Sequence, residues 1–413
     1  MNRTIAILCH LPIFAAVIGN SHSTSEFLVA GFGLSLLLDR YIVRVFRWRP
    51  ISWKREIGLR VGSFVVGSLF FYFIRPGIVP TGEAIYRGVM TCFACAIAEQ
   101  LSLWIGELLR SRWVGIGIVG ASIVAISPAV VFLHPLHTVP KRGPESLGLA
   151  FEDVRFSSDD GTKLAGWLIP AEHARGNIIF CHGHGRCRGQ ALSLLPLYHS
   201  LDLNVLAFDF RGHGDSEGHV STLGDREVAD LRAATRYVRE RFPGRPLILA
   251  GVSLGAAVSL KSLPELGQVD GVWSEGAFAR LDHEIDHEFQ WLPHALRIPV
   301  ERMYYLLGWI DCRMWAPRVN PVDGLTRDDV PISFCHGRKD ELVPLSEGQT
   351  LYDCDRGPKQ CWWVEDATHY NVRQRYRDEY QRRLGDFICT CLARAGKSTP
   401  HLDFGRSIVE DHH

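Results

Sequence analysis

Apolar and polar positions divide the chain into two parts with different spacing. Up to about residue 133 the apolar residues form long runs separated by short charged segments. From residue 151 the apolar runs become short and alternate with amphipathic stretches at 191–201, 225–241 and 346–353, and a long one begins near 373. Short buried strands that alternate with helices are typical of a parallel sheet, so the second part is predicted to be an α/β domain.

The first part, residues 1–135, is predicted to be a helical transmembrane region with about four to five spans. The strongest span is 113–133, which carries no charge over a length that can cross a bilayer. The weaker spans are short or contain charged residues, and they cover 4–19, 27–38, 61–74 and 84–109. Segment 4–19 is also compatible with a signal peptide. An apolar helical domain in water would leave too few polar faces to solvate these helices.

Positive charge predicts how this region is oriented. Residues 39–60 contain Arg40, Arg44, Arg47, Arg49, Lys54, Arg55 and Arg60, and Arg110 and Arg112 precede the last span. Loops rich in Lys and Arg stay in the cytoplasm. If 61–74 and 84–109 both cross, the last span delivers the α/β domain to the extracytoplasmic side. If 84–109 does not cross, the orientation reverses.

Proline and glycine mark the boundary between the two parts. Residues 136–150 contain Pro140, Gly143 and Pro144, a composition that disfavours regular structure and predicts a linker. The α/β domain is expected over 151–395 and opens with two strands, 152–157 and 163–170, joined by a hairpin turn at 158–162. A cap is expected at 277–325, and 396–413 is expected to be a loose tail.

The most informative motif is Gly251-Val252-Ser253-Leu254-Gly255. It follows the apolar run 247–250 and precedes a run compatible with a helix, 256–263. A strand, a sharp turn and a helix form the context of a GxSxG nucleophile elbow, which exposes the serine hydroxyl. Ser253 is therefore the candidate nucleophile.

A serine hydroxyl needs a histidine to accept its proton and a carboxylate to orient that histidine. Asp340 lies in a loop just after the apolar strand predicted at 331–334, and His369 follows the strand predicted at 360–364. These two residues are the candidate acid and base. Glu275 is an alternative acid, because it lies just after the apolar segment Val272-Trp273 and some related folds carry the acid one strand earlier.

A glycine-rich turn follows the strand predicted at 177–180. It contains His182, Gly183, His184 and Gly185, and its backbone N–H groups can point toward a developing oxyanion. His184 and Leu254 are the predicted oxyanion donors. His182, Gly183 and Gly185 are predicted to support this turn, and His182 and His213 to form hydrogen bonds within turns. Asp209 and Arg211 are predicted to brace the glycine-containing turn at 211–218.

These motifs bear a family resemblance. Residues 151–395 resemble the α/β-hydrolase superfamily, in particular its membrane-associated serine hydrolases of the lysophospholipase and S33-peptidase-like branch. The matching segments occur in the order FCHGHG, DFRGHGDSEG, GVSLG, HGRKDELVP and DATHYN, and Ser253, Asp340 and His369 follow the chain order of that family. The resemblance implies an eight-stranded, mostly parallel sheet, hydrolysis through an acyl-enzyme, and no metal or organic cofactor. It does not extend to the first 140 residues.

Three other functions compete with a serine esterase. The segment His283-Glu284-Ile285-Asp286-His287 is an HExxH motif, which on a helix can bind zinc and support a metallopeptidase. However, it falls in the expected cap, and two prolines separate it from Glu301, the nearest carboxylate beyond the cap's WLPHALRIP stretch. A serine peptidase of the S33-like type would use the same triad. A non-catalytic membrane protein would keep the hydrolase fold as an interaction module without the activity.

Composition limits the kinds of partner that this protein is expected to bind. The chain has 45 Lys and Arg against 45 Asp and Glu and no concentrated basic face beyond one short loop, so nucleic acid is not an expected partner. The expected cap is rich in large apolar residues, which form either its own core or a wall for an acyl group. Together with the membrane region this favours lipid-like or acyl-protein esters over peptides. The expected partners are the bilayer and such an ester.

Cysteine positions add little to this interpretation. Cys181 and Cys335 lie at apolar strand ends and are expected to be buried thiols. Cys354, Cys361, Cys389 and Cys391 could pair only in an oxidising compartment.

Overall fold

The computed structural model describes residues 132–135 and 137–396 of the 413 in the chain. The predicted spans, apart from the last two residues of 113–133, and the predicted tail beyond Gly396 lie outside the described residues. None of the helices in the described part combines the length and hydropathy that a bilayer-spanning segment needs. The predictions about the membrane region therefore stay predictions.

The described part is built on one eight-stranded sheet with the strand order β1-β2-β4-β3-β5-β6-β7-β8. β2 pairs antiparallel with β1 and with β4, and every other neighbouring pair is parallel. This confirms the predicted mostly parallel sheet. The strands are β1 (Glu152–Ser157), β2 (Lys163–Ile169), β3 (Gly176–Cys181), β4 (Leu203–Phe208), β5 (Leu247–Val252), β6 (Gly271–Glu275), β7 (Ile332–Gly337) and β8 (Lys359–Val364).

The strand sequences explain their places in the sheet. Every residue of β3, β4, β5, β6 and β7 is buried, as expected for parallel strands covered on both faces. The edge strands β1 and β8 are mixed in burial. The predicted hairpin is present, with Ser157 opposite Lys163 and Gly161 at a φ of 87° in the turn.

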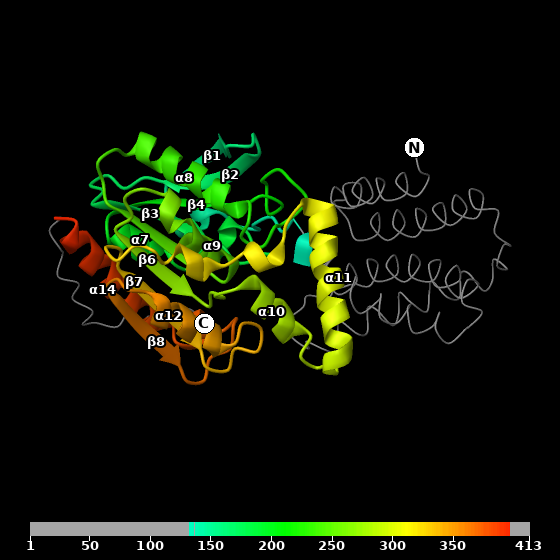
Figure 1. The fold of residues 1–413 in the computed structure, drawn as a ribbon. Helices are drawn as coiled ribbons and strands as arrows, with labels where there is room; N and C mark the ends of the chain where they lie inside the picture. Colours follow the sequence, from blue (N-terminus) through cyan, green and yellow to red (C-terminus); the bar gives the residue numbers. More distant parts are fainter. Residues whose placement is uncertain (1–131, 136, 397–413) are drawn as a thin grey trace, which may run out of the picture.

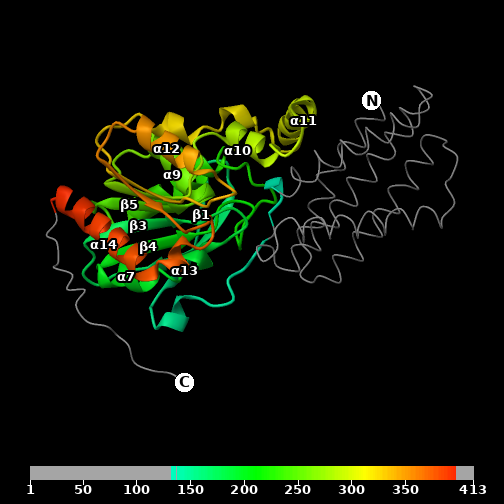
Figure 2. The ribbon, with the colours of Figure 1, turned by 90° about the horizontal axis from the view of Figure 1, so that it is seen from below.

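Helices cover both faces of the sheet (Figures 1 and 2). Figure 2 shows α7, α13 and α14 on one face and α9 and α12 on the other. Buried apolar residues form one cluster on each face. The helices are α7 (Leu195–Ser200), α8 (Glu227–Arg241), α9 (Leu254–Ser262), α12 (Leu345–Cys354), α13 (Val372–Arg375) and α14 (Arg377–Arg394), with 3-10 turns η1 (Pro144–Leu147), η2 (Arg188–Ala191) and η3 (Leu263–Glu265).

The segment between β6 and β7 contains the helices expected for a cap. These are α10 (Leu281–Glu288), α11 (His294–Cys312), η4 (Ala316–Arg318) and η5 (Pro321–Gly324). In Figure 1, α11 stands at the edge of the described part, on the side away from α14. The large apolar residues of this segment divide into two groups. Phe289, Tyr304 and Met314 are buried, whereas Trp291 and Trp309 are exposed.

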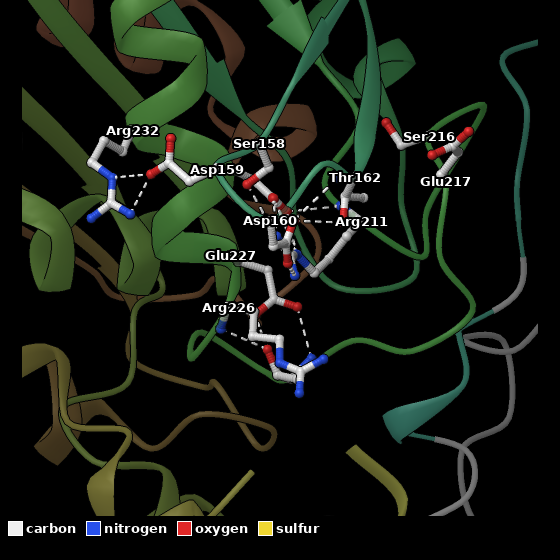
Figure 3. A network of polar contacts seen from close by, with 12 residues as sticks. Ser158, Asp159, Asp160, Thr162, Arg211, Ser216, Glu217, Arg226, Glu227 and Arg232 are labelled. Carbon is white, nitrogen blue, oxygen red and sulfur yellow. Dashed lines mark hydrogen bonds and ion pairs between the residues drawn. The ribbon is translucent and has the colours of Figure 1, made fainter. Parts of the chain in front are cut away.

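A buried polar network ties the hairpin between β1 and β2 to α8 (Figure 3). The Arg211 guanidinium donates to Asp230, to Asp160 at 2.7 Å and to Ser158 at 3.1 Å. Burial raises the pKa of Asp230 to about 6, although its contacts with Arg211 oppose that rise. Removing one partner of such a buried pair costs about 3–5 kcal/mol. The Arg211 side chain thus braces the hairpin against α8, and none of these contacts is with the turn at 211–218 itself.

Asp209 organises the neighbouring loops. Its carboxylate accepts the Arg188 backbone N–H at 2.6 Å and the Asp215 N–H at 3.0 Å, and it also pairs with the Arg188 guanidinium. Arg188 bonds to Asp215 as well, at 2.7 Å. Asp209 is fully buried, and its contacts connect Arg188 with Asp215 in the turn at 211–218. Its position is therefore structural.

Candidate active site

Ser253 occupies the sharp turn between β5 and α9. Its φ is 52° and its ψ is −117°, a backbone conformation that residues other than glycine rarely adopt. Its N–H donates to the carbonyl oxygen of Glu275 at 2.7 Å. Such a strained residue costs about 1–3 kcal/mol and persists only where its surroundings hold it. The turn therefore holds the Ser253 side chain at the end of the strand.

The two glycines of the motif are required by close packing. A Cβ atom on Gly251 would lie 2.5 Å from the Ala256 nitrogen, and one on Gly255 would lie 2.1 Å from the Cys181 carbonyl oxygen. Both contacts are with backbone, which cannot move aside cheaply. The spacing of the GxSxG motif thus follows from how closely α9 passes β5 and β3.

His369 joins the other two predicted triad residues. Its Nε2 lies 3.0 Å from the Ser253 Oγ, and its Nδ1 lies 2.7 Å from the Asp340 Oδ2. An ionised carboxylate can only accept, so the ring proton belongs on Nδ1 and Nε2 is left to accept the serine proton. The structure therefore brings Ser253, Asp340 and His369 together in the order that a serine hydrolase needs.

Asp340 is held as an anion. Its Oδ1 accepts the backbone N–H groups of Leu342 at 3.0 Å and Val343 at 2.8 Å. The Nε2 of His336 lies 3.3 Å from its Oδ2. Burial by itself would raise the pKa of Asp340, but the contacts with His336 and His369 outweigh it and hold the pKa well below its ordinary value. The carboxylate is thus fixed in both position and charge.

Glu275, the alternative acid, faces other partners. Its Oε2 accepts the Tyr380 hydroxyl at 2.7 Å and lies 3.4 Å from the Arg373 Nε. Burial by itself would lower the pKa of Arg373, but the charge of Glu275 raises it. Because the His369 Nδ1 is bonded to Asp340, the geometry favours Asp340 over Glu275 as the acid.

The predicted oxyanion donors lie beside Ser253. Leu254 is the first residue of α9, so its N–H has no acceptor within the helix. A Cβ atom on Gly183 would lie only 3.5 Å from the Ser253 Cβ, which shows how closely the glycine-rich turn passes the serine. His184 and Leu254 line the same cavity as Ser253.

His182 and Gln190 hold this turn in place. His182 accepts the Phe210 N–H through Nε2 at 3.0 Å, and its Nδ1 lies 2.8 Å from the Gly183 carbonyl oxygen. Burial lowers the pKa of His182, which keeps the ring neutral for these two roles. The Gln190 side chain accepts the Gly183 N–H at 2.9 Å. Gly185, at a φ of 65°, allows the turn to reverse. His213, also predicted to serve a turn, is buried with its Nδ1 2.9 Å from the Arg211 carbonyl oxygen.

Sequence analysis missed several residues that complete the site. His336, four residues before Asp340, contacts the acid, and Gln190 fixes the turn. Gly276, at a φ of 62°, leaves room for the His369 ring, since a Cβ there would lie 3.3 Å from its Cε1. Of these three residues, only His336 could have been found from the sequence, because it lies in the same short motif as Asp340.

Ser253 and His369 open into a cavity of about 960 Å³, within the size range of ligand sites. One part of its lining is apolar and includes Leu281, Ile285 and Phe289 from the cap. Another part is polar and includes Gln190 and Arg373. The cavity can therefore hold an amphiphilic molecule across the serine hydroxyl.

The two HExxH histidines lie on α10, and each contacts a different partner outside that helix. His283 Nδ1 lies 3.3 Å from the Glu347 Oε1, and His287 Nε2 lies 3.1 Å from the Glu341 carbonyl oxygen. Glu301 lies 3.6 Å from the Arg297 Nε. Within residues 132–135 and 137–396, no group of three or more His, Cys, Asp or Glu side chains is placed to hold a metal ion. This geometry gives the zinc alternative no support.

The cysteines named by sequence analysis are unpaired. Cys181 and Cys335 are buried as expected, and burial raises the pKa of Cys181 to about 12. Cys354, Cys361, Cys389 and Cys391 are free thiols. None of these thiols contributes to the site.

Comparison with known proteins agrees with this fold. The family model described as serine aminopeptidase, S33, matches residues 172–307. The uncharacterized protein Rv2307c of Mycobacterium tuberculosis is 32% identical over 240 residues, 56% of this chain and 78% of that protein. The uncharacterized membrane protein YNL320W of Saccharomyces cerevisiae is 27% identical over 249 residues, 59% of this chain and 82% of that protein.

Among solved structures, the esterase Pf2001 of Pyrococcus furiosus is 26% identical with a TM-score of 0.53. The match covers 63% of this chain and 100% of the esterase. The chain belongs to the α/β-hydrolase superfamily and, within it, to the same family as the mycobacterial protein Rv2307c.

Proposed function

We propose that the protein is a membrane-anchored serine hydrolase that cleaves carboxylic esters with an apolar acyl group. The observation that carries the proposal is the geometry of His369, which lies 3.0 Å from the Ser253 Oγ and 2.7 Å from the Asp340 carboxylate at the edge of a large cavity. These are hydrogen-bond distances between a nucleophile, its base and the group that orients the base.

The proposed reaction proceeds through an acyl-enzyme. His369 Nε2 takes the Ser253 proton as Oγ attacks the ester carbonyl carbon, and the N–H groups of His184 and Leu254 stabilise the oxyanion. The imidazolium, stabilised by Asp340, then protonates the departing alkoxide as the C–O bond breaks. A water molecule, deprotonated by His369, releases the carboxylic acid and restores the Ser253 hydroxyl.

An ester is favoured over a peptide by the cavity lining. The side chains of Phe278, Leu281, Ile285, Phe289 and Tyr304 line one part of the cavity and offer an apolar wall for an acyl chain. The similar Pyrococcus protein is named an esterase, whereas the matching family model carries a peptidase description. A peptidase on the same triad is therefore the second candidate, and the substrate decides between them.

Labelling and a substrate panel test the proposal. A fluorophosphonate probe should modify Ser253, and long-chain esters should be cleaved faster than acetyl esters or aminoacyl amides. Peptide mapping by mass spectrometry and turnover of each substrate are the measurements. The rate should persist in the presence of a zinc chelator. Labelling at another serine, or faster cleavage of peptide amides, would overturn the esterase assignment. A folded protein that takes no label would favour the non-catalytic interaction module.

We further propose that residues 1–135 anchor the protein in a bilayer, with the hydrolase on the extracytoplasmic side. The proposal rests on the apolar runs and basic loops of this region, and the similar yeast protein is named a membrane protein. Topology reporters fused after Arg49, Arg110 and Arg142 test it. Cytoplasmic signals are expected from the first two and an extracytoplasmic signal from the third. A cytoplasmic signal after Arg142 would reverse the orientation.

A further inference from the structure

The cavity around Ser253 has two walls of different chemistry. The first, which we call the apolar wall, comprises Phe278, Leu281, Ile285, Phe289 and Tyr304, from the cap and the loop before it. The second, which we call the basic wall, comprises Arg186, Gln190, Arg373, Gln374, Arg377 and Gln381. Figure 2 shows α10 and α13 on opposite faces of the sheet, so the two walls approach the serine from opposite sides.

The basic wall carries an excess of positive charge. Among the described lining residues, the carboxylates belong to Glu284 and Glu288, both on α10 in the cap. Arg186 and Arg377 are exposed, and no ion pair to either is found in the described part of the chain. The charge of Arg373, in contrast, is balanced by Glu275.

Arg373 connects this wall to the serine turn. Its Nε lies 3.4 Å from the Glu275 Oε2, and its Nη1 donates to the Gln190 carbonyl oxygen at 3.4 Å. The Glu275 carbonyl oxygen holds the Ser253 N–H, and the Gln190 side chain holds the Gly183 N–H. The Arg373 side chain is 14% exposed, and it lines the cavity. The basic wall is therefore built into the same framework as the nucleophile and the oxyanion turn.

We infer that the basic wall binds an anionic group on the alcohol side of the ester. Guanidinium groups form short, paired hydrogen bonds with carboxylate and phosphate oxygens, and the apolar wall is suited to the acyl side. The substrate class is thus an amphiphilic ester with an apolar acyl chain and a carboxylate or phosphate on its alcohol. This inference rests on the proposed esterase function.

Matched esters test the charge preference. One pair consists of decanoyl esters of 4-hydroxybenzoate, which is anionic, and of methyl 4-hydroxybenzoate, which is neutral. The decanoyl ester of 4-hydroxyphenyl phosphate replaces the carboxylate with a phosphate and separates these two sources of the anion. The quantity measured is the ratio of kcat/KM for the anionic ester to that for the neutral one. Intrinsic leaving-group reactivity cancels when this ratio is compared between variants.

The variants are Arg377→Gln and Arg186→Gln, with Arg375→Gln as a charge-matched control. Arg375 is exposed on α13, two residues from Arg377, but does not line the cavity. Each cavity variant should lower the ratio by roughly tenfold, as expected for one charge-assisted hydrogen bond, and Arg375→Gln should leave the ratio unchanged. Arg373 is not substituted, because its removal would leave Glu275 buried without its cationic partner.

The outcomes separate this inference from the proposed function. Fluorophosphonate labelling together with a ratio that no cavity variant changes would overturn the anion site and leave the esterase intact. An equal loss in Arg375→Gln would also overturn it, because general surface charge would then explain the effect. A protein that takes no label and cleaves no ester would overturn both.

Discussion

Replacing Ser253 with alanine is expected to lower ester hydrolysis by about 10⁵-fold or more, since removal of the nucleophile from such a triad has effects of that order. The substitution leaves His369 and Asp340 in place but removes the oxygen that would form the acyl-enzyme. The measurement is the steady-state kcat of purified Ser253→Ala on a long-chain ester, with fluorophosphonate labelling in parallel.

Ser262→Ala is the matched control for this experiment. Ser262 is also buried on α9, and its hydroxyl donates to the Val258 carbonyl oxygen at 2.7 Å within the helix. Its removal should cost about 1 kcal/mol of stability at most and should keep the hydrolysis rate. If Ser253→Ala retained more than a small fraction of the rate and folded normally, the acyl-enzyme mechanism would be wrong.

Asp340→Asn is expected to lower kcat by about 10³- to 10⁴-fold, because an amide no longer fixes the productive His369 tautomer or stabilises its cation. Glu275→Gln should have a much smaller effect on chemistry. It should instead lower the thermal midpoint, since Arg373 would lose its buried partner at a cost of about 3–5 kcal/mol. Rates and melting curves of both variants are the measurements.

The two variants together identify the acid. Asp340→Asn should combine a large kinetic defect with a folded protein. Glu275→Gln should combine a small kinetic defect with a lower thermal midpoint. If Glu275→Gln, folded at the assay temperature, lost as much kcat as Asp340→Asn, then Glu275 would share the role of the acid despite the contact between His369 and Asp340.

The candidate triad could be picked out in the sequence because its signals are local. The nucleophile elbow is a strand, a turn and a helix in consecutive residues, and Asp340 and His369 each lie in the loop that follows an apolar strand. The sequence left Glu275 open as the acid because it also lies at the end of an apolar strand. Side-chain direction decides between the two acids, and that depends on Arg373 and Tyr380, which lie far along the chain.

Errors at element boundaries have local causes. The helix expected at 191–201 is divided into η2 and the shorter α7, which begins at Leu195 with Pro196 in its first turn. The helix expected from residue 373 onward is interrupted at Tyr376, which has a φ of −122° and a ψ of 42° and separates α13 from α14. No proline or glycine marks this break, so the pattern of apolar positions does not reveal it.

The remaining parts of the site depend on close approach in space. Gly276 makes room for His369, and Gln190 holds the turn at Gly183, but neither belongs to a recognisable motif. The same holds for the basic wall, because Arg186 and Arg377 are far apart in the sequence and line one cavity only in the folded protein. Residue spacing in a single sequence does not show which side chains approach one another in the folded protein.

Glu275 serves two neighbours through two different groups. Its main-chain oxygen restrains the amide of the reactive serine, while its carboxylate neutralises an arginine in the cavity lining. A rearrangement on the ligand side of Arg373 can therefore be transmitted to the nucleophile through a single residue. A ligand that displaced Arg373 would therefore disturb the same residue that restrains the backbone at 253.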